Sequence, residues 1–180
     1  MDIGYALMSA ICTRVVVGGF SFGGGLALDC AARIPSLAGV FAVSPPFRLQ
    51  DLFTRFAFAV TTWNRIMDTM HCHGAAKEFV DIHSERPLIN YAQVPVAALS
   101  ELEHFMKDLE PRLVDVKAPT LVVQAHGDPV VSPDETAIKF NRIGAKQKQY
   151  LPLDFNRHGI LAGEGSENVH AAIAAFIDKL

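Results

Sequence analysis

Residues 13–28 read TRVVVGGFSFGGGLAL, and this stretch decides how the chain folds. Three consecutive valines stand near its start, and a β-branched run without polar alternation is typical of a strand covered on both faces, as in a parallel sheet. Two glycines follow, then a lone serine between two phenylalanines, then three more glycines. Residues 23–33 are mostly small and apolar, which predicts a helix packed close to the strand. We therefore predict a strand, a sharp turn at Ser21 and a helix.

The turn at Ser21 has the form G-x-S-x-G, from Gly19 to Gly23. A nucleophilic serine at such a strand-to-helix turn has strained backbone angles, and side chains at both glycine positions would collide with neighbouring backbone. The helix N-terminus and the backbone N–H of Phe22 would favour negative charge developing on a substrate oxygen. A glycine-rich turn with a capping serine explains the pentapeptide equally well. A phosphate-binding loop is not predicted, because no Lys-Ser or Lys-Thr follows and the G-x-G-x-x-G spacing lacks its later acidic partner.

The rest of the chain alternates between strand and helix patterns. Apolar spacing predicts helices over residues 2–11, 132–144 and 166–180, and buried or polar-flanked strands over residues 37–46, 118–128 and 146–154. Residues 47–111 mix aromatic and charged side chains at helical spacing, which predicts a largely helical insertion with an amphipathic helix over residues 97–110. This order predicts an α/β domain with a mostly parallel sheet flanked by helices, in which residues 1–46 and 112–180 form the core.

Two residues that follow later strands complete a candidate catalytic set with Ser21. Asp128 stands in a Gly-Asp turn after one predicted strand, and His158 lies between the next strand and the last helix. Hydrolases that carry a serine turn of this kind have the chain order serine, acid, histidine. The loops after parallel strands meet at one edge of the sheet, so we expect the three side chains to lie together. His158 would take the Ser21 proton, and Asp128 would orient the imidazole.

On these residues the chain resembles the α/β-hydrolase superfamily, in particular its carboxylesterase and monoacylglycerol-lipase-like serine hydrolases. The nucleophile elbow of this family resembles GFSFGG at residues 19–24. Its acid strand and turn resemble APTLVVQ at residues 118–124 and GDPVV at residues 127–131. Its histidine loop resembles RHG at residues 157–159. The resemblance implies an α/β-hydrolase fold with residues 47–111 as a helical cap. It also implies cleavage of a carboxylic ester through an acyl-enzyme on Ser21, without a cofactor. Thioesters and amides stay open as substrates.

The family pattern extends upstream of the elbow, where several further strands stand and a loop often beginning with His-Gly donates a second oxyanion N–H. No His-Gly precedes Ser21 here, so the N–H of Phe22 is the one oxyanion candidate. The strand at residues 15–17 would lie at the sheet edge, where an apolar strand tends to associate. We therefore expect a fold incomplete at its N-terminal side, belonging to a longer hydrolase or pairing its edge with another chain, and weak or inactive by itself.

Composition and the remaining polar residues narrow the function further. Half of the 180 residues are hydrophobic and the net charge is −3, which favours neither a nucleic-acid nor an anionic-membrane partner. No run of apolar residues is long enough for a transmembrane segment, the N-terminus lacks a signal-peptide pattern, and three irregularly spaced cysteines fit a reducing compartment, so a cytoplasmic location is expected. Phe20 and Phe22 flank the serine and would suit a hydrophobic small-molecule ester.

Several other residues resemble functional groups but are less favoured. The His71-Cys72-His73 run does not place its histidines on one helix face, so no metal site is predicted. His126 stands in the wrong loop for the base, and Asp115 precedes its strand. Asp154 is a weaker candidate for the acid, and His170 is expected to be partly buried in the last helix. The alternative function is a non-catalytic α/β-hydrolase-like binding or assembly module.

Overall fold

The computed structural model describes residues 1–50, 60, 62–67, 69–71, 79–81 and 93–180. The chain divides into two compact units, one formed by Met1–Arg48 with Met106–Leu180 and the other by Leu49–Phe105. The predicted division into residues 1–46, 47–111 and 112–180, with the middle part as a cap, stays a prediction.

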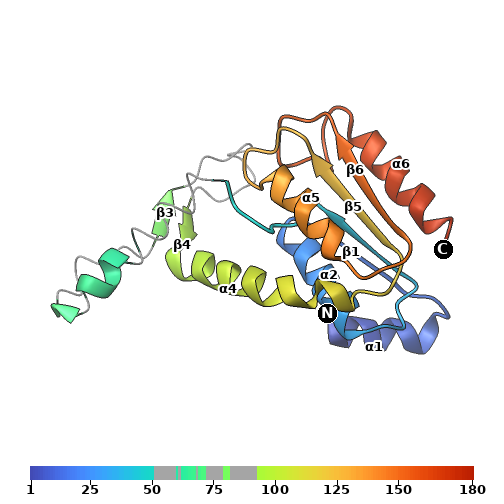
Figure 1. Cartoon of the computed structure of the whole chain (residues 1–180), viewed down its shortest axis with the longest axis horizontal. Helices are drawn as coiled ribbons and strands as arrows, with labels where there is room; N and C mark the ends of the chain where they lie inside the picture. Colours follow the sequence, from blue (N-terminus) through green and yellow to red (C-terminus); the bar gives the residue numbers. More distant parts are fainter. Residues whose placement is uncertain (51–59, 61, 68, 72–78, 82–92) are drawn as a thin grey trace. The chain divides into compact units, whose positions relative to one another are not determined.

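The first unit is built on a parallel four-stranded sheet, as the sequence predicts (Figure 1). Its strands lie in the order β1 (Val16–Phe20), β2 (Gly39–Val43), β5 (Thr120–Ala125) and β6 (Lys148–Leu153). Every residue of β5 is buried, whereas every residue of β1 is only partly buried. The predicted edge position of β1 is therefore confirmed. All four strands run the same way, so the loops that follow them gather at one edge.

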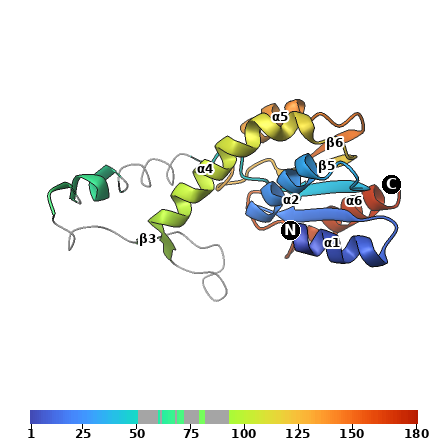
Figure 2. The same ribbon diagram turned by 90° about the horizontal axis from the view of Figure 1, so that it is seen from below.

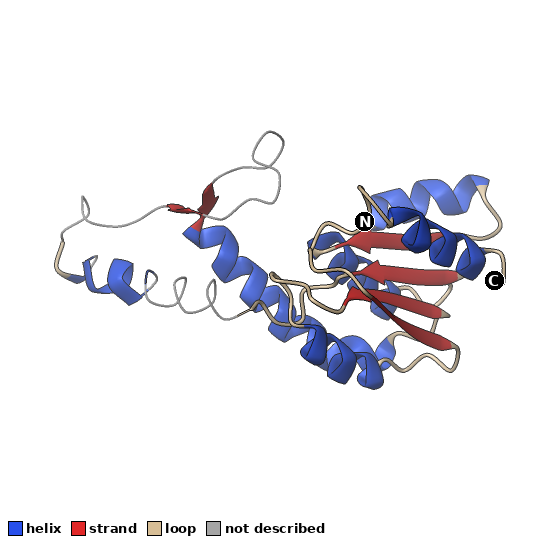
Figure 3. Ribbon diagram, turned by 90° about the horizontal axis from the view of Figure 1, so that it is seen from above, coloured by secondary structure: helices blue, strands red, loops and turns tan. Residues whose placement is uncertain are grey.

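Helices lie on both faces of this sheet (Figure 3). Helix α2 (Phe22–Arg33) packs on the face that carries Ala42, because a methyl group at Gly24 would touch the Ala42 side chain. Helix α6 (Ser166–Ile177) packs on the opposite face, where its Val169 joins Val43, Leu121 and other residues in the main apolar cluster. Successive side chains of a strand point to opposite faces, which separates Ala42 from Val43.

Two more helices of this unit follow the sequence expectations closely. Helix α5 (Pro133–Arg142) begins at the predicted start signal, because the Ser132 hydroxyl accepts a hydrogen bond from the backbone N–H of Glu135. Helix α1 (Asp2–Ile11; Figure 2) forms where apolar spacing predicts it, but none of its residues is buried. Its apolar residues Ile3, Leu7 and Ile11 are 80%, 66% and 79% exposed.

The second unit contains two short strands that the sequence did not predict. β3 (Phe79–Asp81) pairs antiparallel with β4 (Gln93–Pro95), and three residues are too few to show a strand period. Helix α4 (Val96–Arg112) covers the predicted amphipathic helix; its residues from Met106 on, and the short 3-10 helix η2 (Leu113–Asp115) that follows it, belong to the first unit. Most other residues of the predicted insertion lie outside the described part of the chain. None of the helices described here is long and apolar enough to cross a membrane.

Candidate active site

The backbone at Ser21 has the strained geometry expected of a sharp strand-to-helix turn. Ser21 has φ 52° and ψ −125°, a positive φ that non-glycine residues rarely adopt. A methyl group at Gly19 would lie 2.2 Å from the carbonyl carbon of Gly23, so this position requires glycine. A methyl group at Gly23 would meet nothing within 4 Å. The expectation that both glycines prevent collisions is therefore right for Gly19 and wrong for Gly23.

The structure brings Ser21, His158 and Asp128 into one line of hydrogen bonds. His158 Nε2 lies 2.9 Å from Ser21 Oγ, and His158 Nδ1 lies 2.8 Å from Asp128 Oδ2. The three residues follow β1, β6 and β5 respectively, so the shared edge of a parallel sheet assembles them as expected. An ionised Asp128 accepts the proton on Nδ1, which leaves Nε2 to accept the Ser21 hydroxyl proton.

Asp128 is a buried carboxylate with donors on both oxygens. The backbone N–H groups of Val130 and Val131 donate to Oδ1 at 2.8 and 2.9 Å, while Gln124 Nε2 donates to Oδ2 at 3.2 Å. Burial raises the pKa of Asp128, but the hydrogen bond and charge of His158 and the two backbone donors lower it by more. The net pKa lies below the ordinary value, so Asp128 is ionised at neutral pH.

The loop that carries His158 is held against the loop that carries Asp128. The backbone N–H of Gly127 donates to the Phe155 carbonyl at 2.9 Å, and a methyl group at Gly127 would lie 2.2 Å from Asn156 Oδ1. Arg157 extends the support, because its Nε donates to the Gly159 carbonyl at 3.3 Å. The ring of Phe20 lies against the His158 ring, with 4.8 Å between the ring centroids and the two rings tilted by 40°. These contacts fix the position of the imidazole.

Phe22 adjoins the nucleophile, whereas the residues that the sequence favours less lie outside the line of hydrogen bonds. Phe22 is the first residue of α2, directly after the serine, and its side chain is 44% exposed. His126 and Asp154 are exposed, and neither belongs to the line of hydrogen bonds described above. His170 is also exposed, with Nε2 3.0 Å from the Leu161 carbonyl, so its predicted partial burial is wrong. Gln124 was not predicted; a polar residue inside the apolar run LVVQA was the available signal.

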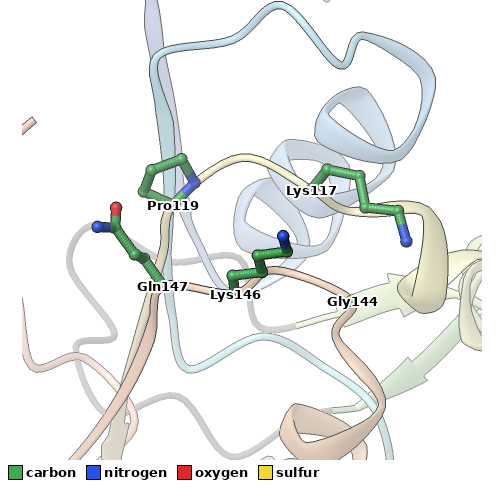
Figure 4. Close-up of a pocket in the computed structure, with 5 residues that line it drawn as sticks. All are labelled: Lys117, Pro119, Gly144, Lys146 and Gln147. Atoms are coloured by element: carbon green, nitrogen blue, oxygen red, sulfur yellow. The ribbon is translucent and has the colours of Figure 1, made fainter.

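The described residues form no metal cluster, and the cavity of Figure 4 lies away from this centre. The described residues contain no group of three histidine, cysteine or acidic side chains that could hold a metal ion, and Cys72 and His73 lie outside them. A surface cavity of about 600 Å³ is lined by Lys117, Pro119, Gly144, Lys146 and Gln147, which Figure 4 shows. Its lining residues precede β5 and β6, so the cavity lies at the sheet edge opposite to Ser21.

The sequence of this chain is similar to a known family of hydrolases over most of its length. Residues 9–165 match the family described as serine aminopeptidase, S33. The chain belongs to this family. Its predicted resemblance to α/β hydrolases of the carboxylesterase and monoacylglycerol-lipase type is confirmed by two curated relatives. These are a thermostable monoacylglycerol lipase of Bacillus sp. (strain H-257), 23% identical over 158 residues, and a carboxylesterase of Bacillus subtilis (strain 168), 22% identical over 162 residues.

The relatives also show how much of their length this family member spans. The aligned parts are 88% and 90% of this chain but only 60% and 63% of the two relatives. Among solved structures, one from a study of the metagenome-derived lipolytic enzymes LipS and LipT has a TM-score of 0.81 at 23% identity and covers 99% of this chain and 71% of its own. The monoacylglycerol lipase of Paleococcus ferrophilus has a TM-score of 0.74 at 18% identity, covering 98% and 72%. The α/β-hydrolase fold is thus confirmed.

Proposed function

We propose that this chain carries the catalytic centre of a serine hydrolase that cleaves a carboxylic ester through an acyl-enzyme on Ser21. The observation that carries the proposal is the unbroken line of hydrogen bonds from Ser21 Oγ through the His158 ring to Asp128 Oδ2. The positive φ of Ser21 supports it, because strained backbone at a polar residue is typical of active sites.

In the proposed reaction His158 carries one proton in the acylation half and another in the deacylation half. Nε2 takes the Ser21 hydroxyl proton as Oγ bonds to the ester carbonyl carbon, and then gives that proton to the leaving alcohol as the carbon–oxygen bond breaks. Water repeats the sequence in the second half: His158 removes its proton, the hydroxide attacks the acyl-enzyme, and Oγ regains a proton as the acid leaves. Asp128 orients the ring and stabilises the imidazolium that forms in each half.

The N-terminus of α2 would stabilise the oxyanion of the tetrahedral intermediate. Phe22 follows the nucleophile directly, and its backbone N–H is the proposed donor. The side chains of Phe20 and Phe22 are proposed to contact an apolar acyl or alcohol group, because both flank Ser21 and Phe22 is partly exposed. The names of the monoacylglycerol lipase and the carboxylesterase support an ester as the substrate, and an amide stays open because the family is described as a serine aminopeptidase.

We further propose that the open edge of β1 pairs with additional polypeptide, from an upstream segment or from another chain. β1 is partly buried along its whole length, and three large apolar residues of α1 are at least 66% exposed. A strand added parallel to β1 would end beside Ser21, so the loop after it could supply the second oxyanion donor. Losing one such donor lowers turnover by roughly 10²–10³-fold, so the chain alone is expected to be weak. A 19.6 kDa monomer that stays in solution at high concentration would contradict this pairing.

A fluorophosphonate probe tests the proposed nucleophile. We expect covalent labelling of Ser21, no labelling of Ser21→Ala, and labelling of His158→Ala slowed by roughly 10⁴-fold or more, as for other triad histidines. His126→Ala is the matched control, because His126 is exposed and precedes Asp128 by two residues. Labelling that does not change in His158→Ala would refute the triad. A chain that is never labelled, even with a partner on its β1 edge, would favour the non-catalytic binding module.

A further inference from the structure

We propose that Gln124 is a positioning residue that holds Asp128 Oδ2 toward His158 through its side-chain amide, a role that rests on the proposed function of that carboxylate. Gln124 lies near the end of the central strand β5 and is fully buried. Its Nε2 donates to Asp128 Oδ2 at 3.2 Å, and the same oxygen lies 2.8 Å from His158 Nδ1. Gln124 therefore acts on the oxygen that faces the histidine.

The two oxygens of Asp128 accept hydrogen bonds from different parts of the fold. Oδ1 is held by the backbone N–H groups of Val130 and Val131, which belong to the turn itself. Oδ2 receives a donor from the sheet, Gln124, and one from the histidine loop, His158. The backbone donors fix one end of the carboxylate, and Gln124 fixes its rotation by holding the other end.

The orientation of the Gln124 amide is determined by its neighbours. Nε2 also lies 3.3 Å from the Ala125 carbonyl, so exchanging Nε2 and Oε1 would point an oxygen at two other acceptors. In the observed orientation, Oε1 is buried without a hydrogen bond in the described structure. A buried acceptor without a donor is costly, and an apolar residue would avoid that cost in a strand whose other buried neighbours are Val122, Val123 and Ala125. A locally unfavourable residue beside a candidate site indicates a functional role.

Gln124 also lies in the same row of the sheet as the nucleophile. The Ser21 N–H donates to the Val43 carbonyl, and the Ser44 N–H donates to the Val123 carbonyl, both at 2.8 Å. This continues the parallel register by one residue on each strand and aligns Ser21, Ser44 and Gln124 across three adjacent strands. A polar row at the carboxyl end of an apolar sheet lies at the base of the site.

Removing the amide donor should make the ionised Asp128 less stable. Among the described residues, His158 is the titratable group that contacts and acts on Asp128, while Gln124 and the two backbone donors do not titrate. Gln124→Met keeps the length of the side chain and removes both amide groups. We expect the pH midpoint of the Asp128 carboxyl carbon, followed by NMR, to rise by about one unit, equivalent to one weak hydrogen bond to a charged group.

Thr120→Val provides the matched control. Thr120 is buried on the same face of β5, and its hydroxyl donates to the Ala118 carbonyl. We expect this variant to leave the Asp128 midpoint unchanged. A Gln124→Met chain with the wild-type midpoint, or a Thr120→Val chain with the same rise, would overturn the proposal.

A measurement on the unmodified chain covers the case in which Gln124→Met does not fold. The Gln124 side-chain amide protons should shift with pH at the midpoint of the Asp128 carboxyl carbon, because they donate to that carboxylate. Amide signals that do not follow the Asp128 titration would overturn the proposed contact.

The labelling rate of Ser21 separates this proposal from the proposed function. We expect Gln124→Met to slow fluorophosphonate labelling by about tenfold while the Thr120→Val rate stays at the wild-type value. Equal rates for Gln124→Met and the wild type would refute the positioning role alone. An unmodified chain that is never labelled, even with a partner on its β1 edge, would refute the proposed function, and the NMR titrations would still decide the Gln124–Asp128 contact.

Discussion

Gly19, the first residue of the turn, offers the sharpest test of how the turn is built. A methyl group at Gly19 would lie 2.2 Å from both the carbonyl carbon and the carbonyl oxygen of Gly23, and 2.7 Å from the amide nitrogen of Gly24. All three atoms are backbone of the first turn of α2, so no side-chain rotation relieves the clash. Gly19→Ala must therefore push α2 away from β1 or distort Ser21.

The cost of this substitution follows from the kind of atoms that clash. Overpacking a core costs roughly 1–3 kcal/mol, and a clash with backbone belongs at the upper end, about 3 kcal/mol. For a domain of this size the melting temperature should fall by about 6–12 °C, at about 2–4 °C per kcal/mol. Gly23→Ala adds the same methyl group where nothing lies within 4 Å, and alanine is the better helix former by up to about 1 kcal/mol. This control should melt at or slightly above the wild-type temperature.

Thermal unfolding followed by circular dichroism measures both variants directly. Labelling of Ser21 by the fluorophosphonate gives a second readout. Displacement of the turn would lengthen the 2.9 Å hydrogen bond between Ser21 Oγ and His158 Nε2, so Gly19→Ala should be labelled more slowly. The reasoning is refuted if Gly19→Ala melts like the wild type, or if Gly23→Ala loses as much stability as Gly19→Ala.

Three further substitutions test single contacts. The pKa of Asp128 is held below its ordinary value of 3.8, so its ionised form stabilises the fold above that pH and the contribution disappears as the pH falls through the lowered pKa. Asp128→Asn should thus lower the free energy of unfolding, measured in urea, by about 2 kcal/mol at pH 7 and by much less in acid. A decrease that does not depend on pH would contradict this. Ser132→Ala removes the hydroxyl that accepts a hydrogen bond from the Glu135 N–H and caps α5, and it should lower the free energy of unfolding by about 1 kcal/mol. The melting temperature should fall in this variant and not in the control Ser166→Ala. Asp29→Asn removes the carboxylate shared by Arg33 and Arg112, although Arg33 keeps its ion pair with Asp2, and should lower the free energy of unfolding by about 1–2 kcal/mol at low salt; a loss unchanged by high salt would argue against the ion pairs.

Most of the sheet could be predicted from the sequence because its signals are local. The β-branched run before Gly19 and the apolar run before Gln124 are β1 and β5, and the Ser132 cap marks the start of α5. The hairpin of β3 and β4 was missed because each strand has only three residues, and pairing between them depends on contacts that no periodicity records. Local patterns thus predict long elements and fail on short ones.

The meeting of Ser21, Asp128 and His158 could be predicted because parallel strands bring their following loops to one edge. What escaped prediction depends on tertiary distances. Gly19 and Gly23 look equivalent in the pentapeptide, yet only Gly19 lies against backbone. Gln124 looks like a single polar residue in a strand, and its meaning becomes clear only when the loop folds back to bring Asp128 over it.

The contrast between β1 and β5 connects composition to environment. Both strands lack polar alternation, a pattern that fits a strand covered on both faces and paired on both edges. β5 has two neighbours and every residue is buried, whereas β1 pairs, within the described part of the chain, with β2 alone and every residue stays partly exposed. The same mismatch appears in α1, whose apolar residues at helical spacing, Ile3, Leu7, Met8 and Ile11, are 45–80% exposed. Because burial of apolar surface drives folding, a strand and a helix of this composition would gain stability from a further neighbour, and Ser21 lies at the end of the strand that would receive it.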